Sequence, residues 1–229
     1  MKTALITGIG RGIGKALADK FIKEGWHVIG TVLSSATPGS DLNLESYLLD
    51  LSSPQSIAKC ASLIAKSSAK IDVLINNAGI LADEDETRVI INKLRKTLEV
   101  NLIGTIDFTE QIIPTMNKDC HIVSMSSQAG SLEEAVGHLE DSHEPYHYPA
   151  YKISKCAINM YTRTLANRLR HEDDRGIIVS SVNPGWVKTD MGGEEAPTKP
   201  EQAAEDIYKL AVSRPETGQF WYKGNKYPW

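Results

Sequence analysis

Thr7-Gly8-Ile9-Gly10-Arg11-Gly12-Ile13-Gly14 lies between a short apolar segment, 4–7, and a helical pattern at about 14–24. Its four glycines within seven positions let the backbone approach a pyrophosphate and aim the amino end of the helix at it. The string fits T-G-x-x-x-G-x-G, and the strict G-x-G-x-x-G is absent. A glycine-rich turn without a ligand is the alternative. The strand–turn–helix setting favours a nucleotide site.

Strand-like and helical patterns alternate along the rest of the chain. The expected strands are 4–7, 27–33, 47–49, 71–75, 121–125, 177–182 and 219–222, and the expected helices are 14–24, one opening after Ser53-Pro54, 89–116, 150–170 and 200–212. The strands are apolar on both faces, which is typical of a parallel sheet covered by helices on both sides. The sequence predicts one α/β domain, 1–229, with a doubly wound sheet of about seven mostly parallel strands flanked by helices on both faces.

The end of the second expected strand indicates which dinucleotide binds. An acidic residue about 20 positions into such a unit would bind the ribose 2′-hydroxyl and select NAD. No carboxylate occurs from Val28 to Ser40. A 2′-phosphate would meet no like charge there, Arg11 could pair with it, and Ser34 or Ser35 could hydrogen-bond it. The sequence therefore predicts NADP(H) in preference to NAD(H), although Arg11 also fits a solvated surface cation.

Tyr151 and Lys155 stand four positions apart near the start of the expected helix 150–170. At this spacing the phenol and the ammonium project from one helix face. A nearby cation stabilises a phenolate and lowers the pKa of the phenol, which makes tyrosine a usable proton donor at neutral pH. The pair alone is a weak signal, because many helices contain it by chance.

Together, the motifs resemble those of the short-chain dehydrogenase/reductase family over nearly the whole chain. The matching parts are Thr7-Gly8 with Gly12-Ile13-Gly14, Asp50-Leu51, Asn76-Asn77-Ala78-Gly79, Val100-Asn101-Leu102, Ser126 to Gly130, Tyr151 with Lys155, and Pro184 to Thr189. The resemblance implies a Rossmann-type fold and an NADP-dependent enzyme of the carbonyl reductase type. Its substrate would be a small ketone, aldehyde or quinone, reduced to an alcohol by hydride transfer.

The resemblance also implies a role for each matching residue. Ser127 would hydrogen-bond the substrate oxygen, and Tyr151 would donate the proton. Lys155 would bind the nicotinamide ribose and lower the Tyr151 pKa, and Asn101 would hold a water linking Lys155 to solvent. A helix amide bonded to nearby backbone is the alternative for Asn101, and a strand-end turn residue for Ser127. With the residues argued above, the expected cofactor site is Gly8, Gly10, Arg11, Gly12, Ile13, Gly14, Ser34, Asp50, Leu51, Asn77, Ala78, Gly79, Tyr151, Lys155, Pro184, Gly185, Trp186, Val187 and Thr189.

Ser127 and Tyr151 are farther apart than is usual in the family, which predicts an insertion near 132–149 beside the substrate mouth. A substrate loop is expected near 186–199. The candidate substrate-binding residues are Leu81, Gln128, Tyr146, Tyr148, Trp186 and Met191, with His143 as a further possibility. His138, His143 and His147 also suggest a metal, but their spacing fits no compact pair and the reaction needs none, so no metal site is predicted.

Within the family, the segments Thr189 to Pro197 and Thr217 to Trp229 resemble the C-factor and sniffer-like carbonyl reductases. That likeness leaves a second hypothesis open, a dinucleotide-sensing or signalling protein on the same fold with little turnover. The set Asn101, Ser127, Tyr151 and Lys155 favours the enzyme, because a sensor needs no acid. The long helices expected near 89–116 and 150–170 resemble the family's dimer-forming pair, so a homodimer is expected.

Composition excludes other partners. The net charge of -4 provides no basic surface for nucleic acid and no polybasic patch for a membrane. No apolar run is long enough to span a bilayer, and Met1 leads into a strand rather than a signal peptide. Scattered cysteines favour a reducing compartment, so a cytoplasmic location is expected. The charged runs Asp83-Glu84-Asp85-Glu86 and Glu172-Asp173-Asp174-Arg175 are expected to be solvated loops.

Overall fold

A computed structural model of the chain describes residues 1–34, 42–67, 69–134 and 147–229. The strands are β1 (Thr3–Ile6), β2 (His27–Val32), β3 (Leu44–Leu48), β4 (Ile71–Asn76), β5 (Met116–Met125), β6 (Ile178–Val182), β7 (Gln219–Tyr222) and β8 (Asn225–Lys226). They form one sheet in the order β3-β2-β1-β4-β5-β6-β7-β8. Neighbours pair in parallel except β7 and β8. The predicted doubly wound α/β fold is confirmed, with β8 as an additional strand too short to show a periodicity.

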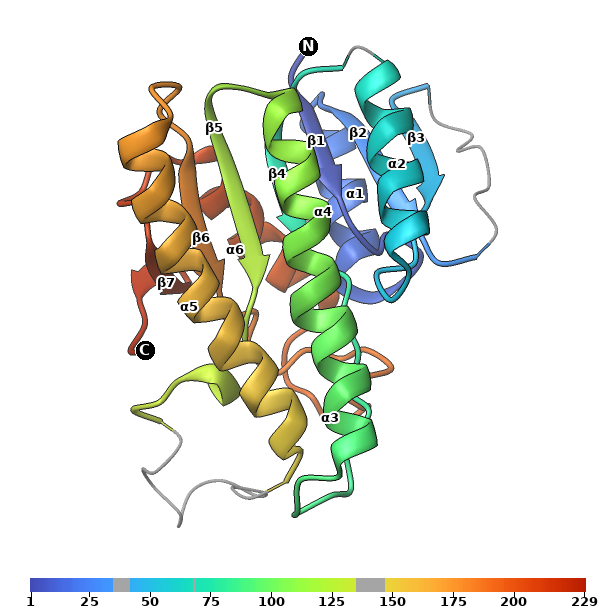
Figure 1. Ribbon diagram of the computed structural model, residues 1–229, viewed down its shortest axis with the longest axis vertical. Helices are drawn as coiled ribbons and strands as arrows, with labels where there is room; N and C mark the ends of the chain where they lie inside the picture. The colour runs from blue at the N-terminus through green and yellow to red at the C-terminus, as the bar shows by residue number, and fades with distance from the viewer. Residues whose placement is uncertain (35–41, 68, 135–146) are drawn as a thin grey trace.

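Helices cover both faces of the sheet. They are α1 (Gly12–Lys23), α2 (Pro54–Lys66), α3 (Ile91–Leu98), α4 (Thr105–Ile112), α5 (Pro149–Glu172) and α6 (Pro200–Val212). In Figure 1, α2, α4 and α5 lie in front of the sheet, and α1 and α6 lie behind it. The front core includes Ile57, Ile64, Phe108, Leu165 and Leu74, and the rear core includes Leu17, Phe21, Ile207, Ile75 and Val123. Burial on both sides explains why the central strands are apolar at nearly every position.

The expected helical stretch 89–116 is present at 91–115, and it contains a π-helical turn. The chain forms α3, a π-helical turn η1 (Glu99–Gly104), α4 and a short 3-10 turn η2 (Ile113–Thr115), and β5 already begins at Met116. At Gly104 an added Cβ would lie 1.9 Å from the carbonyl oxygen of Leu51, so the helix backbone lies directly on the loop after β3. A π turn in a helix often marks a functional region, and this one contains Asn101.

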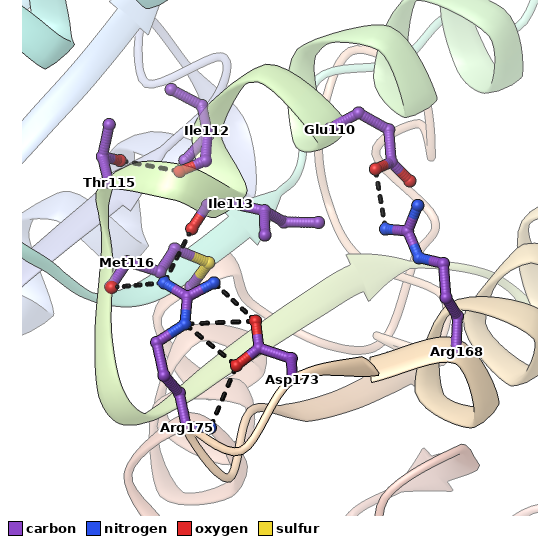
Figure 2. A network of polar contacts seen from close by, with 8 residues as sticks. All are labelled: Glu110, Ile112, Ile113, Thr115, Met116, Arg168, Asp173 and Arg175. Atoms are coloured by element: carbon purple, nitrogen blue, oxygen red, sulfur yellow. Dashed lines mark hydrogen bonds and ion pairs between the residues drawn. The ribbon is translucent and has the colours of Figure 1, made fainter. Parts of the chain in front are cut away.

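The carboxyl end of α5 is fixed to the end of α4 by Arg175 (Figure 2). The guanidinium donates to the Asp173 carboxylate and to the carbonyl oxygens of Ile113 and Met116, at 3.1 and 2.9 Å. Arg175 also holds the pKa of Asp173 below its ordinary value, mainly through this hydrogen bond. The expectation of a solvated loop is therefore wrong for this pair, which anchors a long helix.

Candidate active site

The carboxyl ends of β1 and β4 flank the point where the strand order reverses, which is where open α/β sheets bind ligands. The Thr7 hydroxyl accepts hydrogen bonds from the backbone N–H groups of Asn77 and Ala78, at 2.9 and 3.0 Å. The Asn77 amide donates to the carbonyl oxygens of Thr7 and Gly8, at 2.8 and 3.2 Å. Asn77 and Ala78 thus brace the glycine turn against β4.

The glycine turn has the shape of an anion cradle. Gly8 and Gly12 have φ values of +74° and +56°, which strain other residues. A Cβ at Gly14 would lie 2.1 Å from the Gly8 carbonyl oxygen. In the described part of the chain no side chain caps the amino end of α1, and its first turn carries no acid. The free N–H groups there suit a pyrophosphate.

Ser127, Tyr151 and Lys155 meet beyond the carboxyl end of β5. Ser127 precedes the 3-10 turn η3 (Gln128–Gly130), and its hydroxyl accepts from Ala129 N at 3.1 Å and hydrogen-bonds the Tyr151 phenol. The Lys155 ammonium lies 5.3 Å from the centre of the Tyr151 ring. Tyr151 and Lys155 therefore share a face of α5, as their spacing predicts.

The pKa values of this pair differ from the sequence expectation. Burial raises the pKa of Tyr151 to about 12, and the hydrogen bond with Ser127 opposes that shift only in part. Lys155 is buried, and its Nζ donates to the Met125 carbonyl oxygen at 2.8 Å. Burial lowers the pKa of Lys155 to about 8. The pKa of Tyr151 therefore lies above its ordinary value instead of below it, because desolvation of the phenol outweighs stabilisation of its anion. Tyr151 consequently keeps its proton at neutral pH.

The Asn101 side chain hydrogen-bonds the backbone of Ile80, as in the alternative considered for it. Its Oδ1 accepts from Ile80 N at 2.8 Å, and its Nδ2 donates to Ile80 O at 2.9 Å and to Ser154 Oγ at 3.1 Å. The amide thereby joins the loop after β4 to Ser154 on α5. The water relay through Asn101 stays a prediction.

The remaining expected cofactor residues differ in their exposure and in the contacts that they make. Arg11 forms an exposed ion pair with Asp190 of the loop after β6, so a 2′-phosphate would have to displace that partner. Ser34 is exposed, and Ser35 lies outside the described residues. Asp50 accepts from Ser52 N at 2.8 Å and orders the turn before α2. Leu51, one of the expected cofactor residues, is buried in the core.

The loop after β6 folds back over the glycine turn. A Cβ at Gly12 would lie 3.2 Å from Thr189 Cγ2. Val187 is buried and forms a bridge with Thr198. Trp186 Nε1 donates to the Gly192 carbonyl oxygen at 2.6 Å, and Pro184 and Gly185 form the bend from which the loop leaves the sheet. This loop therefore contacts the glycine turn through Thr189.

Two of the expected substrate residues, Gln128 and Trp186, line a cavity of about 540 Å³ together with Tyr222 and Lys223. Sequence reasoning did not place the last two at the substrate site, although they belong to the segment Thr217 to Trp229 that carries the resemblance; Tyr222 ends β7 and Lys223 follows it. Tyr148 instead packs edge-on against Tyr151, with ring centres 6.2 Å apart. Leu81 is half-buried and Met191 is exposed, and neither lines this cavity. Tyr146 lies outside the described residues, as do His138 and His143.

Asp83 is a further residue that sequence reasoning placed wrongly. It belongs to a run expected to be a solvated loop, yet its carboxylate is buried and accepts from Ala150 N at 2.6 Å. Nothing in the run of four acids distinguishes the buried one from its neighbours.

Metal-binding groups of three or more His, Cys, Asp or Glu side chains are absent from the residues described by the structure. Over the same residues, no helix has the length and apolar character needed to cross a membrane.

The fold and this constellation agree with a family match. The model of the family described as short chain dehydrogenase matches residues 2–200. The chain belongs to the short chain dehydrogenase family.

Individual relatives are similar over almost the full length. Carbonyl reductase (NADPH) 1 of Mus musculus is 28% identical, over 99% of this chain and 98% of the relative. The solved structure of the carbonyl reductase Sniffer of D. melanogaster is 26% identical, with a TM-score of 0.86 and 100% of both chains covered. A short-chain dehydrogenase/reductase from Burkholderia multivorans with bound NADP is 26% identical, with a TM-score of 0.82, and covers 100% of this chain and 99% of that one.

Proposed function

We propose that the chain is an NADP(H)-dependent oxidoreductase that reduces the carbonyl of a ketone, aldehyde or quinone to an alcohol, with Tyr151 as the proton donor. One observation carries the proposal. The half-buried Tyr151 phenol hydrogen-bonds Ser127 and lies beside the buried Lys155, at the edge of the sheet where the glycine turn opens. A dinucleotide sensor without turnover would need the glycine turn but not this acid.

The residues present fit a nicotinamide dinucleotide. The uncapped amino end of α1 would hold the pyrophosphate, and Lys155 would reach the nicotinamide ribose. When bound, the nicotinamide supplies the hydride. Ser127 and Tyr151 would hold the substrate oxygen by hydrogen bonds, and the Tyr151 phenol would give that oxygen its proton. The Lys155 ammonium would stabilise the phenolate that remains.

The preference for NADP(H) over NAD(H) rests on charge. The described end of β2, up to Ser34, carries no carboxylate that would repel a 2′-phosphate, and Arg11 stands at the glycine turn. The mouse relative is an NADPH enzyme by name, and the Burkholderia structure contains NADP. We expect a lower Kd for NADPH than for NADH, measured by fluorescence titration. Equal Kd values would contradict this preference.

The chain would work as a single domain, 1–229, in which the insertion near 132–149 and the loop near 186–199 border the substrate. The cavity lined by Trp186, Pro197 and Thr198 supports the assignment for the loop near 186–199. We also infer a homodimer through the α3–α4 and α5 helices, since Ile103 and Met160 expose apolar side chains on them. A cytoplasmic location stays part of the same proposal.

The test of the proton donor is the variant Tyr151→Phe. Removing the phenol hydroxyl should lower kcat about 1,000-fold or more, because general-acid catalysis supplies about 10²–10⁴. The Kd for NADPH should change little, because the ring remains. NADPH oxidation is followed by absorbance across a panel of ketones, aldehydes and quinones. Near wild-type turnover of the variant would refute the mechanism, and NADPH binding without any turnover by the wild type would favour the sensor.

A further inference from the structure

The Asp83 carboxylate lies buried at the amino end of α5, although it belongs to a run of four acidic residues. The residue is 1% exposed. Its Oδ2 accepts the hydrogen bond from Ala150 N at 2.6 Å, while Oδ1 is buried without a hydrogen-bond partner among the described residues. Burying a carboxylate with only part of its hydrogen-bonding capacity used is costly. The site at the helix terminus offsets that cost, because the helix dipole favours negative charge there.

The first turn of α5 depends on this remote acceptor. Tyr148, at the N-cap position, has a left-handed φ of +49° and provides no side-chain cap. Pro149 has no N–H, so Ala150 carries the first N–H inside the helix, and Tyr151 follows directly. Asp83 is 67 positions away in the chain and supplies the cap that the local sequence lacks.

The loop that carries Asp83 is itself fixed on both sides. The Asn101 side chain accepts a hydrogen bond from Ile80 N and donates one to Ile80 O. Farther along the loop, the Glu86 carbonyl oxygen accepts from Tyr148 N at 2.9 Å. The loop after β4 therefore spans from the π turn to the residues just before Tyr151, with Asp83 as its buried contact with the helix.

We propose that Asp83 is a positioning residue for Tyr151, a role that rests on the carbonyl reduction proposed above. Its carboxylate sets the first turn of α5, and the phenol projects from that same turn toward Ser127. A displacement of about 1 Å between reacting groups can lower a rate about 100-fold. Removing the carboxylate should therefore affect proton transfer more than dinucleotide binding, because the glycine turn lies on β1 and α1.

The experiment compares three variants with the wild type. Asp83→Ala removes the acceptor, Asp83→Asn keeps an acceptor oxygen at the same position, and Asp85→Ala removes an exposed acid of the same loop as the matched control. Active sites are counted by NADPH titration, and kcat, KM and the deuterium isotope effect on hydride transfer are measured. Hydrogen exchange of the amides at 150–154 reports the first turn without reference to activity.

We expect Asp83→Ala to lower kcat per active site about 10–100-fold, with the Kd for NADPH within about twofold, a larger isotope effect and faster exchange at 150–154. Asp83→Asn should recover kcat to within about threefold, and Asp85→Ala should match the wild type. If Asp83→Ala does not fold, Asp83→Ser takes its place, because its short hydroxyl ends well before Ala150.

Three results would overturn the role. They are an unchanged kcat per active site in Asp83→Ala, an equal loss in Asp85→Ala, and unchanged exchange at 150–154. The first two leave the reductase standing, since the wild type still turns over. A wild type without turnover instead defeats the proposed function. Hydrogen exchange at 150–154 then still tests whether Asp83 holds the first turn of α5, because that measurement does not depend on activity.

Discussion

Burial moves the two ionisable groups of the site in opposite directions. The pKa of Tyr151 rises to about 12 and that of Lys155 falls to about 8, because a low-dielectric environment disfavours the charged form of each. Over the neutral range the phenol keeps its proton and the lysine is largely charged. These are the states that carbonyl reduction requires, an acid ready to donate and a cation ready to stabilise the resulting phenolate.

The Lys155 pKa predicts how the reaction depends on pH. Since its pKa is lowered to about 8, the ammonium is present below that pH and is lost above it. We expect kcat/KM for reduction to be level near pH 6–7 and to fall by about tenfold per unit well above pH 8. Lys155→Arg should keep its charge and move the decline to higher pH. A wild-type profile that stays level to pH 10 would contradict this role of Lys155.

At the scale of elements, α5 is held by tertiary contacts at both ends. Asp83 binds its amino end, and Arg175 with Asp173 ties its carboxyl end to the end of α4 (Figure 2). Both anchors come from charged runs that look like solvated loops. The glycine turn before α1 is the second element on which the site depends, and there the contact is between backbone atoms.

Gly14→Ala tests the packing of the glycine turn. The added methyl would lie 2.1 Å from the Gly8 carbonyl oxygen and 2.5 Å from Asn77 Nδ2, so the turn must shift. Overpacking of this kind costs about 1–3 kcal/mol of unfolding free energy, and the Kd for NADPH should rise at least tenfold. Urea unfolding and fluorescence titration measure the two effects.

Gly10→Ala is the matched control for stability. Among the described residues, its Cβ would meet only Val32 Cγ1, at 3.8 Å, which is ordinary contact. We expect its unfolding free energy to stay within about 0.5 kcal/mol of the wild type. Equal destabilisation by the two substitutions would show that the close contact at Gly14 is not the cause.

At the scale of the molecule, the strand order brings distant segments to one edge of the sheet. The glycine turn follows β1, Asn77 follows β4, Ser127 follows β5 and Pro184 follows β6. Because these strands are parallel, their carboxyl ends meet at the same edge. Figure 1 shows α5 in front of β6. Lys155, on α5, reaches the carboxyl end of β5 through its hydrogen bond to the Met125 carbonyl oxygen.

The proposed homodimer belongs to the scale of the whole molecule. We expect light scattering after gel filtration to give twice the chain mass of 25.2 kDa. Met160 is 66% exposed on α5, so Met160→Glu should place a charge in the interface and release monomers. Leu63→Glu, on α2, is the control, since Leu63 is 41% exposed on a helix outside the inferred interface. A monomeric wild type would refute the dimer.

Local patterns in the chain were sufficient for the sheet, the glycine turn and the Tyr151–Lys155 pair. Apolar periodicity, a glycine string and an i, i+4 spacing all act over a few residues, so they can be read without knowing what packs where. Two other features join residues that lie far apart in sequence. The helix backbone at Gly104 lies against the Leu51 carbonyl oxygen, and the buried Asp83 carboxylate accepts from Ala150 N. The directions of the Tyr151 and Lys155 pKa shifts also depend on tertiary structure, because burial results from the packing of distant segments and cannot be read from the local sequence.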